Sequence, residues 1–221
     1  MKGVNSKDNK SDPYDNSTNN SVVTMNANAV TSETQTSNSS DNAASSKNTQ
    51  FPDNKQMPGN APSSIGGFDM DADESCVLTI NGGTVTINAD GDGINSNGYF
   101  YMNGGTVYVE GPESNGDSAL DYSISASITG GCFLATGYSG MAQSFGSDST
   151  QCTYILTLSS NVSGTTTVTL TDNDENVLLS HETTKSYNSI IVSCPELTIG
   201  STYTLTAGDT SQSITPTSTV N

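Results

Sequence analysis

Carboxylate and amide side chains gather on glycine-rich segments of the sequence, where their oxygen atoms could bind a cation. Calcium takes roughly six to eight oxygen ligands, and a glycine-rich turn lets side-chain and carbonyl oxygens converge on one ion. The Asp-Gly-Asp-Gly segment and its surroundings therefore predict a calcium (Ca²⁺) site. The predicted metal ligands are Asp90, Asp92, Asn95, Asn97, Asp117 and Asp121. The alternative is that these residues only form turns, which Asp and Asn favour.

Three tyrosines, Tyr99, Tyr101 and Tyr108, alternate with apolar residues and should therefore face away from the protein interior. An exposed tyrosine ring offers a flat apolar face to the C–H side of a pyranose. We expect these three residues to be substrate-binding residues that contact a sugar. The alternative is that they are ordinary tyrosines on a solvent-facing strand.

Catalysis has less support than binding. Elimination at the carbon next to a carboxylate would need a cationic base, commonly Arg, but the chain has no Arg and only Lys185 beyond residue 65. Hydrolysis needs two carboxyl groups about 5–9.5 Å apart. The aspartates of the predicted calcium site could supply them, but calcium would compete for the same groups. We therefore assign no catalytic residue, and a lyase or hydrolase is the less favoured prediction.

Two further acidic segments have the spacing with which an EF-hand loop begins. One contains Asp69, Asp71 and Asp73, and the other contains Asp172 and Asp174. Neither segment has Gly at the sixth position or Glu at the twelfth, so the EF-hand interpretation fails. A weaker role in calcium binding is left open for Asp71 and Asp73.

The four cysteines, Cys76, Cys132, Cys152 and Cys194, have no CxxC spacing, and the chain has one histidine. A zinc or redox site of Cys and His is therefore not expected. Cys132 and Cys152 flank a loop rich in Gly and Ser, and they could form a disulfide in an oxidising compartment. Free buried thiols are the equal alternative.

Composition divides the chain near residue 65. Residues 1–65 are mostly Ser, Asn, Thr, Asp, Ala and Lys, which predicts a low-complexity, largely disordered segment. Residues 66–221 are rich in Thr, Val, Ile, Leu, Tyr and Gly, a composition typical of β structure. They carry 17 acidic groups against the single Lys185. This charge disfavours nucleic acid and attracts cations, and the lack of a long apolar run argues against membrane insertion.

One pattern occurs three times within residues 66–148. Leu78–Ile87 (LTINGGTVTI) recurs as Phe100–Val109 (FYMNGGTVYV) and, more weakly, as Ala126–Ala135 (ASITGGCFLA). Each copy predicts two short strands joined by a turn whose glycines can adopt φ > 0. A single copy cannot bury its own apolar face, so the copies should stack. The predicted fold class is all-β, with about three coils of a right-handed parallel β-helix.

Stacking of the copies predicts which residues meet in the interior. One expected row is Ile80, Met102 and Ile128, and the other is Val85, Val107 and Phe133. Residues 149–221 contain further strand-like segments separated by turn clusters, which predict a small antiparallel β cap or sandwich. Within them, Leu197–Tyr203 resembles a tyrosine corner, in which the Tyr hydroxyl bonds back to the preceding turn.

Residues 81–98 (NGGTVTINADGDGINSNG) carry a resemblance to a known family, together with shorter motifs that follow in order. These motifs are GDSALDY at 116–122, SGMAQ at 139–143 and TKSY at 184–187. Across most of the chain beyond residue 70, the sequence resembles the clostridial carbohydrate-binding β-helix family, whose fold is similar to that of pectate lyases. The resemblance implies binding of cellulose or of acidic sugars such as polygalacturonate, with calcium in the β-helix.

The same resemblance implies an extracellular or cell-surface location. Met1–Ser6 (MKGVNS) is similar to the close of an upstream coil in that family, so we interpret the chain as truncated at its N-terminus, with the signal peptide lost. A true start at Met1 in a cytosolic protein is the alternative.

The leading function hypothesis is an extracellular, non-catalytic module that binds plant cell-wall polysaccharide, with calcium as its cofactor. The glycan would be cellulose or a pectate-like acidic sugar, and the module is expected to be a monomer. The alternative is a structural or adhesive cell-surface solenoid.

Overall fold

The computed structural model describes residues 4–5, 22–26 and 72–221, and every regular element within these ranges is a β-strand. The segment predicted to be disordered, residues 1–65, lies outside the described residues except for β1 (Val4–Asn5) and β2 (Val22–Asn26). Asp69 and Asp71 also lie outside them. The predicted domain boundaries therefore stay predictions.

The three copies of the repeat each give a set of short strands. The first copy forms β3 (Val77–Gly82), β4 (Thr84–Asn88) and β5 (Ile94–Ser96). The second forms β6 (Tyr99–Met102), β7 (Thr106–Glu110) and β8 (Leu120–Tyr122). The third forms β9 (Ser125–Ile128) and β10 (Cys132–Gly137).

Corresponding strands of successive copies pair in parallel, and their register aligns the repeat with itself. Ile80 lies opposite Met102, which lies opposite Ile128. Val85, Val107 and Phe133 form a second row in the same way. All six side chains are at most 1% exposed. Both predicted interior rows are therefore confirmed.

The glycine turns between these strands have the backbone conformation that the sequence predicts. Gly83, Gly105 and Gly131 have φ of 82°, 92° and 92°, a region that side-chain-bearing residues rarely adopt. At Gly105, an added Cβ would also lie 2.7 Å from the carbonyl oxygen of Gly83 in the adjacent copy. Glycine is thus needed here both for the turn and for the close stacking of the copies.

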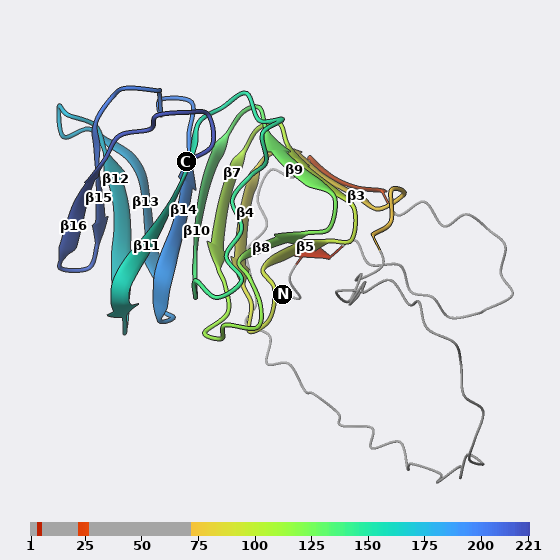
Figure 1. Cartoon of the computed structure of the whole chain (residues 1–221), viewed down its shortest axis with the longest axis horizontal. Coiled ribbons are helices and arrows are strands. Elements are labelled where there is room, and N and C mark those ends of the chain that lie inside the picture. The colour runs from red at the N-terminus through yellow and green to blue at the C-terminus, as the bar shows by residue number, and fades with distance from the viewer. Residues whose placement is uncertain (1–3, 6–21, 27–71) are drawn as a thin grey trace, which may run out of the picture.

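Beyond the repeats the strands pair with one another in the antiparallel sense. These strands are β11 (Thr153–Val162), β12 (Thr166–Thr171), β13 (Val177–Thr183), β14 (Tyr187–Ser193), β15 (Tyr203–Ala207) and β16 (Thr210–Ile214). β14 lies between β10 and β11 and is antiparallel to both. The other four form a separate antiparallel sheet in the order β13-β12-β15-β16, which lies at one end of the row of repeat strands (Figure 1).

The predicted fold class, a right-handed parallel β-helix followed by an antiparallel cap, is wrong. The chain is all-β, but the described strands form separate sheets: β1-β5-β8 and β2-β3-β6-β9 are parallel, β11-β14-β10-β7-β4 is mixed, and the last sheet is antiparallel. The mixed sheet is the main departure, because β14 pairs directly with β10 and continues the repeat sheet in the opposite direction. Internal repeats predict which strands align with each other, but they carry no information about a strand outside the repeat that joins their sheet.

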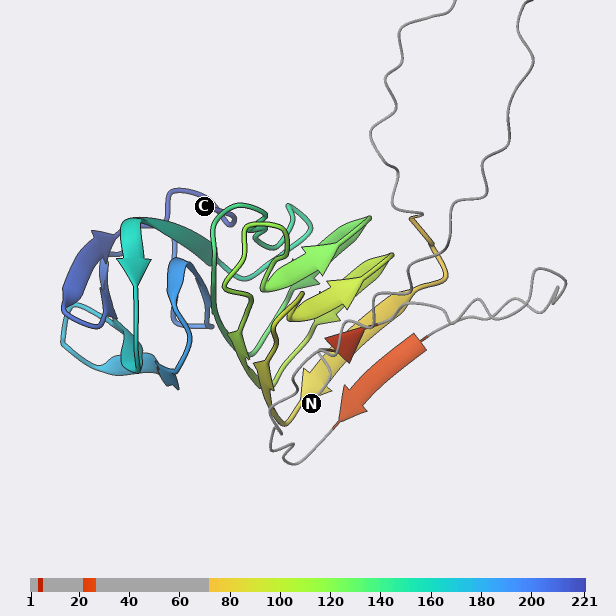
Figure 2. The same ribbon diagram turned by 90° about the horizontal axis from the view of Figure 1, so that it is seen from below.

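The central strands of the mixed sheet, β10 and β14, are buried on both faces and separate two apolar cores. On β10, Phe133 and Ala135 enter the core formed by the repeats, whereas Leu134 enters the core shared with the antiparallel sheet. β14 alternates in the same way, with Ile191 on the first side and Val192 on the second. Seen from below, the elements run from the C-terminal sheet at one end to β2 and β1 at the other (Figure 2).

The predicted tyrosine corner is confirmed. The hydroxyl group of Tyr203 donates a hydrogen bond of 2.6 Å to the backbone oxygen of Glu196, and it accepts one of 2.9 Å from the backbone N–H of Thr198. Tyr203 is 4% exposed. The bond fixes the turn before β15 against the second core.

Candidate functional site

β5 and β8 place a row of polar side chains at the same point of two successive repeats. Ile94 and Leu120 are paired in the register of this sheet and are fully buried in the first core. The next pair is Asn95 and Asp121. They lie 26 residues apart on corresponding strands of the first two copies, so stacking brings these groups together although they are distant in sequence.

Asn95 joins two carboxylates through one amide group. Its Nδ2 donates hydrogen bonds of 2.8 Å to Asp92 Oδ2 and 3.2 Å to Asp121 Oδ2. Asp92 Oδ1 accepts a further bond of 2.8 Å from the backbone N–H of Ser118. Asp121 Oδ1 accepts one of 3.2 Å from Gln143 Nε2. The result is a cluster of two carboxylates and two amides, which we call the carboxylate–amide cluster (Asp92, Asn95, Asp121 and Gln143).

The amide oxygen of Asn95 has no hydrogen-bond partner in the structure, although the residue is only 4% exposed. A buried polar atom without a partner costs about 1–3 kcal/mol, and such atoms are uncommon in folded proteins. The Asn95 oxygen therefore lacks a donor, although the amide nitrogen of the same side chain is fully used. Asp92 and Asp121 both accept from the same amide nitrogen, Nδ2 of Asn95. The cluster therefore carries net negative charge close to an oxygen that has no donor.

Two of the other three predicted calcium ligands, Asp90 and Asp117, have side-chain partners elsewhere. Asp90 forms an ion pair with Lys185, with Nζ 2.9 Å from Oδ1. Asp117 Oδ2 accepts a hydrogen bond of 2.8 Å from the Ser114 hydroxyl group. Asn97 contributes its backbone oxygen to the N–H of Asp73. The structure thus brings together Asp92, Asn95 and Asp121 of the six predicted ligands.

Gln143 completes the cluster but was not among the predicted ligands. It follows Asp121 by 22 residues. The first two Gly-Gly pairs, which begin at Gly82 and Gly104, are also 22 residues apart, and this spacing is the sequence signal that could have indicated Gln143. Within the described residues, no three His, Cys, Asp or Glu side chains converge as a metal site would require. Any cation at the carboxylate–amide cluster would therefore depend on amide oxygens as well as carboxylates.

The three predicted sugar-binding tyrosines occupy two different sheets. Tyr99 and Tyr101 lie on β6, are partly exposed, and stack with ring centroids 5.8 Å apart and an interplanar angle of 12°. Tyr108 lies on β7, where its ring stacks on His181 at 4.5 Å and packs against the second core. Burial and the nearby Cys132 raise the pKa of Tyr108. Tyr99 and Tyr101 thus form a common surface that Tyr108 does not share.

A buried carboxylate, Glu110, joins the repeats to the C-terminal strands. Its Oε2 accepts hydrogen bonds of 2.8 Å from both the N–H and the hydroxyl group of Thr184, and one of 3.3 Å from Thr183. Burial by itself raises the pKa of Glu110, but the contacts with His181 and Thr184 outweigh it and lower the pKa to about 2. His181 Nε2 lies 3.6 Å from Oε1, which is too far for a hydrogen bond.

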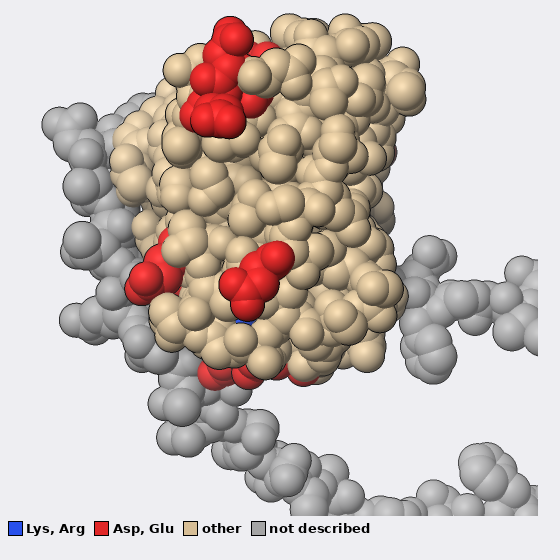
Figure 3. Space-filling model, turned by 90° about the vertical axis from the view of Figure 1, so that its left-hand side faces the viewer, with Lys and Arg blue, Asp and Glu red and all other residues tan. Residues whose placement is uncertain are grey.

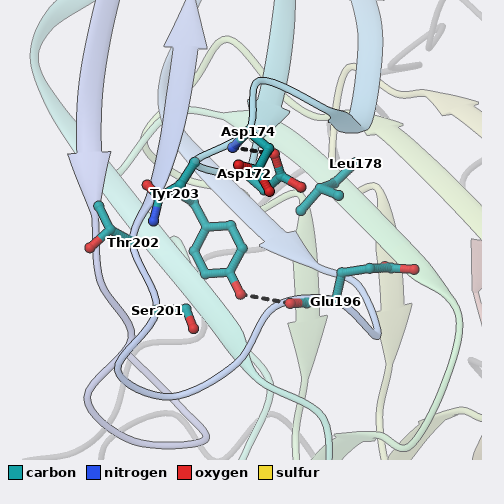
Figure 4. A pocket seen from close by; sticks show the side chains of 8 residues that line it. Asp172, Asp174, Leu178, Glu196, Ser201, Thr202 and Tyr203 are labelled. Carbon is teal, nitrogen blue, oxygen red and sulfur yellow. Dashed lines mark hydrogen bonds between the residues drawn. The ribbon is translucent and has the colours of Figure 1, made fainter.

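The second acidic segment lines a pocket of about 270 Å³ between the β12–β13 turn and the loop before β15 (Figure 4). Asp172 accepts hydrogen bonds from the side chain and backbone of Asn176 and from the N–H of Asp174. The hydrogen bonds from Asn176 lower the pKa of Asp172. This is the geometry of a turn closed by an Asp side chain, so the turn itself accounts for the residue types.

On one face of the molecule the acidic side chains lie in separate patches rather than in one continuous field (Figure 3). The face seen in Figure 3 shows separate groups of Asp and Glu with mostly uncharged surface between them. Over the whole chain the net charge is −17. A polyanion approaching this surface would meet repulsion unless cations lay between them.

Comparison of the chain with protein-family models, with curated proteins and with solved structures found no match. No helix within the described residues has the length and hydropathy that crossing a bilayer requires. The candidate site is therefore defined by its geometry alone.

Proposed function

We propose that the protein is an extracellular, non-catalytic module that binds plant cell-wall polysaccharide and uses calcium at the carboxylate–amide cluster. The observation that carries the proposal is the unsatisfied oxygen of Asn95 beside two carboxylates. The sequence resemblance to carbohydrate-binding proteins supports the ligand class.

The residue types of the cluster fit calcium in a specific way. Calcium is bound by carboxylate oxygens and by the oxygens of Asn and Gln amides. The amide oxygen and nitrogen are nearly equal in size, so rotating the Asn95 amide by half a turn would direct its oxygen toward Asp92 and Asp121. A cation would then replace the N–H group as the positive partner of both carboxylates, and the Asn95 oxygen would become one of its ligands, while Nδ2 would take the position of the oxygen that has no partner now.

Acidic glycans would need this cation to bind. Beyond residue 65 the chain has 17 acidic groups and one Lys, and Lys185 already pairs with Asp90. Direct ion pairs with uronate groups are therefore scarce, and like charges raise the cost of approach. Calcium with spare coordination positions would accept oxygens from both the protein and the glycan.

Neutral glycans would bind through a different surface. Tyr99 and Tyr101 are parallel and partly exposed on β6, and they offer two ring faces to a pyranose chain. Cellulose binding at these rings would not require a cation. The two glycan classes are thus separable by chelation.

The first experiment is retention of the full chain on polygalacturonate and cellulose gels in calcium and in EDTA. We expect retention on polygalacturonate in calcium only, and retention on cellulose in both. Asp121→Asn should lose the calcium-dependent retention, whereas Asp209→Asn, on the exposed turn after β15, should keep it. Retention on neither gel would contradict the proposal and would favour the structural or adhesive alternative.

A further inference from the structure

Three of the four cysteines lie at the ends of adjacent strands of the mixed sheet. Cys132 begins β10, Cys152 immediately precedes β11, and Cys194 immediately follows β14. The register pairs Phe133 with Ser193 on one side and Thr153 with Ser193 on the other. One step further along each strand, Cys194 stands between Cys132 and Cys152.

The three thiols point to the same side of the sheet. Residues directly opposite each other in a sheet share a face, and Cys132, Cys152 and Cys194 all pack in the second core. Gln151 holds this end of the sheet together, because its Nε2 donates to the Gly131 carbonyl group at 2.9 Å and to the Ser193 hydroxyl group at 2.8 Å. The strand ends that carry the thiols are therefore fixed relative to one another.

Strand spacing decides which thiols can join. Opposite residues of an antiparallel pair have Cα atoms about 4.5–5.5 Å apart, which lies within the range of about 4.4–6.8 Å that a disulfide spans. Cys132 and Cys152 are two strands apart, at roughly 10 Å, which is too far. The Cys132–Cys152 disulfide left open by the sequence is thus excluded by the strand order, and Cys194 is the partner available to both. The structure itself contains no disulfide among these residues.

We propose that this row of thiols is a disulfide-forming site in which Cys194 is the shared partner and Cys132 the preferred one. Cys132 is partly exposed, whereas Cys152 and Cys194 are 8% and 0% exposed. A small-molecule disulfide therefore reaches Cys132 first. This inference does not depend on the proposed polysaccharide function.

The reaction consists of two thiol–disulfide exchanges. The Cys132 thiolate attacks a small-molecule disulfide, forms a mixed disulfide and releases one thiolate, which takes up a proton. The Cys194 thiolate then attacks the Cys132 sulfur of the mixed disulfide and displaces the second small-molecule thiol. Two protein thiols lose two electrons in total, and the small-molecule disulfide gains them as two thiols.

The surroundings of the thiols make this reaction slow at neutral pH. Burial and the charge of Glu196 raise the pKa of Cys194 to about 12, and the same two causes raise the pKa of Cys132. The thiolate is the attacking species, so the rate should increase with pH. Glu196→Gln removes a nearby negative charge and should accelerate oxidation, whereas Glu182→Gln on the exposed side of β13 should not.

The test is oxidation of the folded full chain with oxidised glutathione at pH 8.5, followed by digestion without reduction and mass spectrometry of the linked peptides. We expect a Cys132–Cys194 link in the wild type, in Cys152→Ser and in the control Cys76→Ser. Cys132→Ser should form Cys152–Cys194 more slowly, because both thiols are buried. Cys194→Ser should form no intramolecular disulfide.

Three results would overturn the inference. These are a Cys132–Cys152 link in the folded wild type, an intramolecular disulfide in Cys194→Ser, or three reduced thiols in the wild type after prolonged oxidation at pH 8.5. If a Ser variant does not fold, the peptide map of the wild type still decides between the three pairings.

Discussion

At the scale of single residues, the cation proposal depends on Asn95. Its amide nitrogen now satisfies Asp92 and Asp121, and its oxygen satisfies nothing. Asn95→Asp would replace both N–H donors with a third carboxylate. Three carboxylates at one buried position repel each other unless a cation is bound, because burial disfavours the charged forms.

The first prediction is therefore that Asn95→Asp makes stability depend strongly on calcium. Calcium should raise the melting temperature (Tm) of the wild type by several degrees at millimolar concentration, since binding to the folded state stabilises it. In Asn95→Asp, Tm should fall in EDTA and the increase on adding calcium should be larger. Asp209→Asn should behave as the wild type in calorimetry. If the wild type and Asn95→Asp each had the same Tm in calcium and in EDTA, the calcium site at Asn95 would be contradicted.

The second prediction separates the tyrosines. Tyr101→Ala removes one ring of the exposed stack with Tyr99, and a ring contact with a ligand contributes about 1 kcal/mol. Retention on cellulose should therefore weaken about fivefold, with little change in Tm. Tyr108→Ala removes the ring that stacks on His181, so Tm should fall while affinity per folded molecule is kept. Affinity electrophoresis in cellulose derivatives measures the affinity of both variants, and calorimetry measures their Tm. A loss of binding from Tyr108→Ala alone would place the sugar site on β7.

At the scale of elements, the turn between β13 and β14 is fixed to the repeats by Glu110. This carboxylate accepts two hydrogen bonds from Thr184 and one from Thr183. Lys185, next in sequence, pairs with Asp90 after β4. These contacts join segments about 75–95 residues apart in sequence, so they hold the two cores in one body.

The third prediction concerns acid stability. The folded-state pKa of Glu110, about 2, lies below its ordinary value of 4.5. Its contribution is therefore complete above pH 4.5 and decreases as pH falls toward 2. The shift corresponds to about 3 kcal/mol. Glu110→Gln should destabilise the protein by about that amount at pH 7 in urea unfolding.

The decisive part of that measurement is how the difference in unfolding free energy between wild type and Glu110→Gln changes with pH. The gap between wild type and Glu110→Gln should narrow between pH 4.5 and 2, because the wild-type carboxyl group becomes protonated there. Glu182→Gln, exposed on β13, should change stability little at any pH. A gap that stays constant down to pH 2 would show that Glu110 acts by shape and not by charge.

Repeats predicted the local structure well. The rows Ile80–Met102–Ile128 and Val85–Val107–Phe133, and the left-handed glycine turns, follow from repeat spacing and side-chain alternation. The fold class was wrong because β14 lies outside the repeat and nothing in its local sequence shows that it pairs with β10.

The candidate site was predicted in part for the same reason. Asp92, Asn95 and Asp121 come together through repeat stacking, which the sequence reveals. Asp90 is taken by Lys185, which lies 95 residues away, and Tyr108 is covered by His181 of a different sheet. Contacts of this range depend on the packing of the C-terminal strands and leave no periodic signal.

At the scale of the whole molecule, charge sets the conditions for binding. A net charge of −17 with six Lys favours binding of cations and opposes binding of polyanions. Binding of a neutral glycan should change little with salt concentration, because the glycan carries no charge whose interactions salt could screen. Binding of an acidic glycan should need a divalent ion, and monovalent salt should weaken it by screening.

The most direct test of the account is the affinity for polygalacturonate in calcium, in magnesium and in EDTA, for the wild type and for Asp121→Asn. We expect wild-type binding in calcium, at least tenfold weaker binding in magnesium, which demands stricter octahedral geometry and keeps its waters, and no binding in EDTA. Asp121→Asn should bind weakly in all three. Equal wild-type affinity in calcium and EDTA would contradict the central claim that a cation at the carboxylate–amide cluster mediates binding.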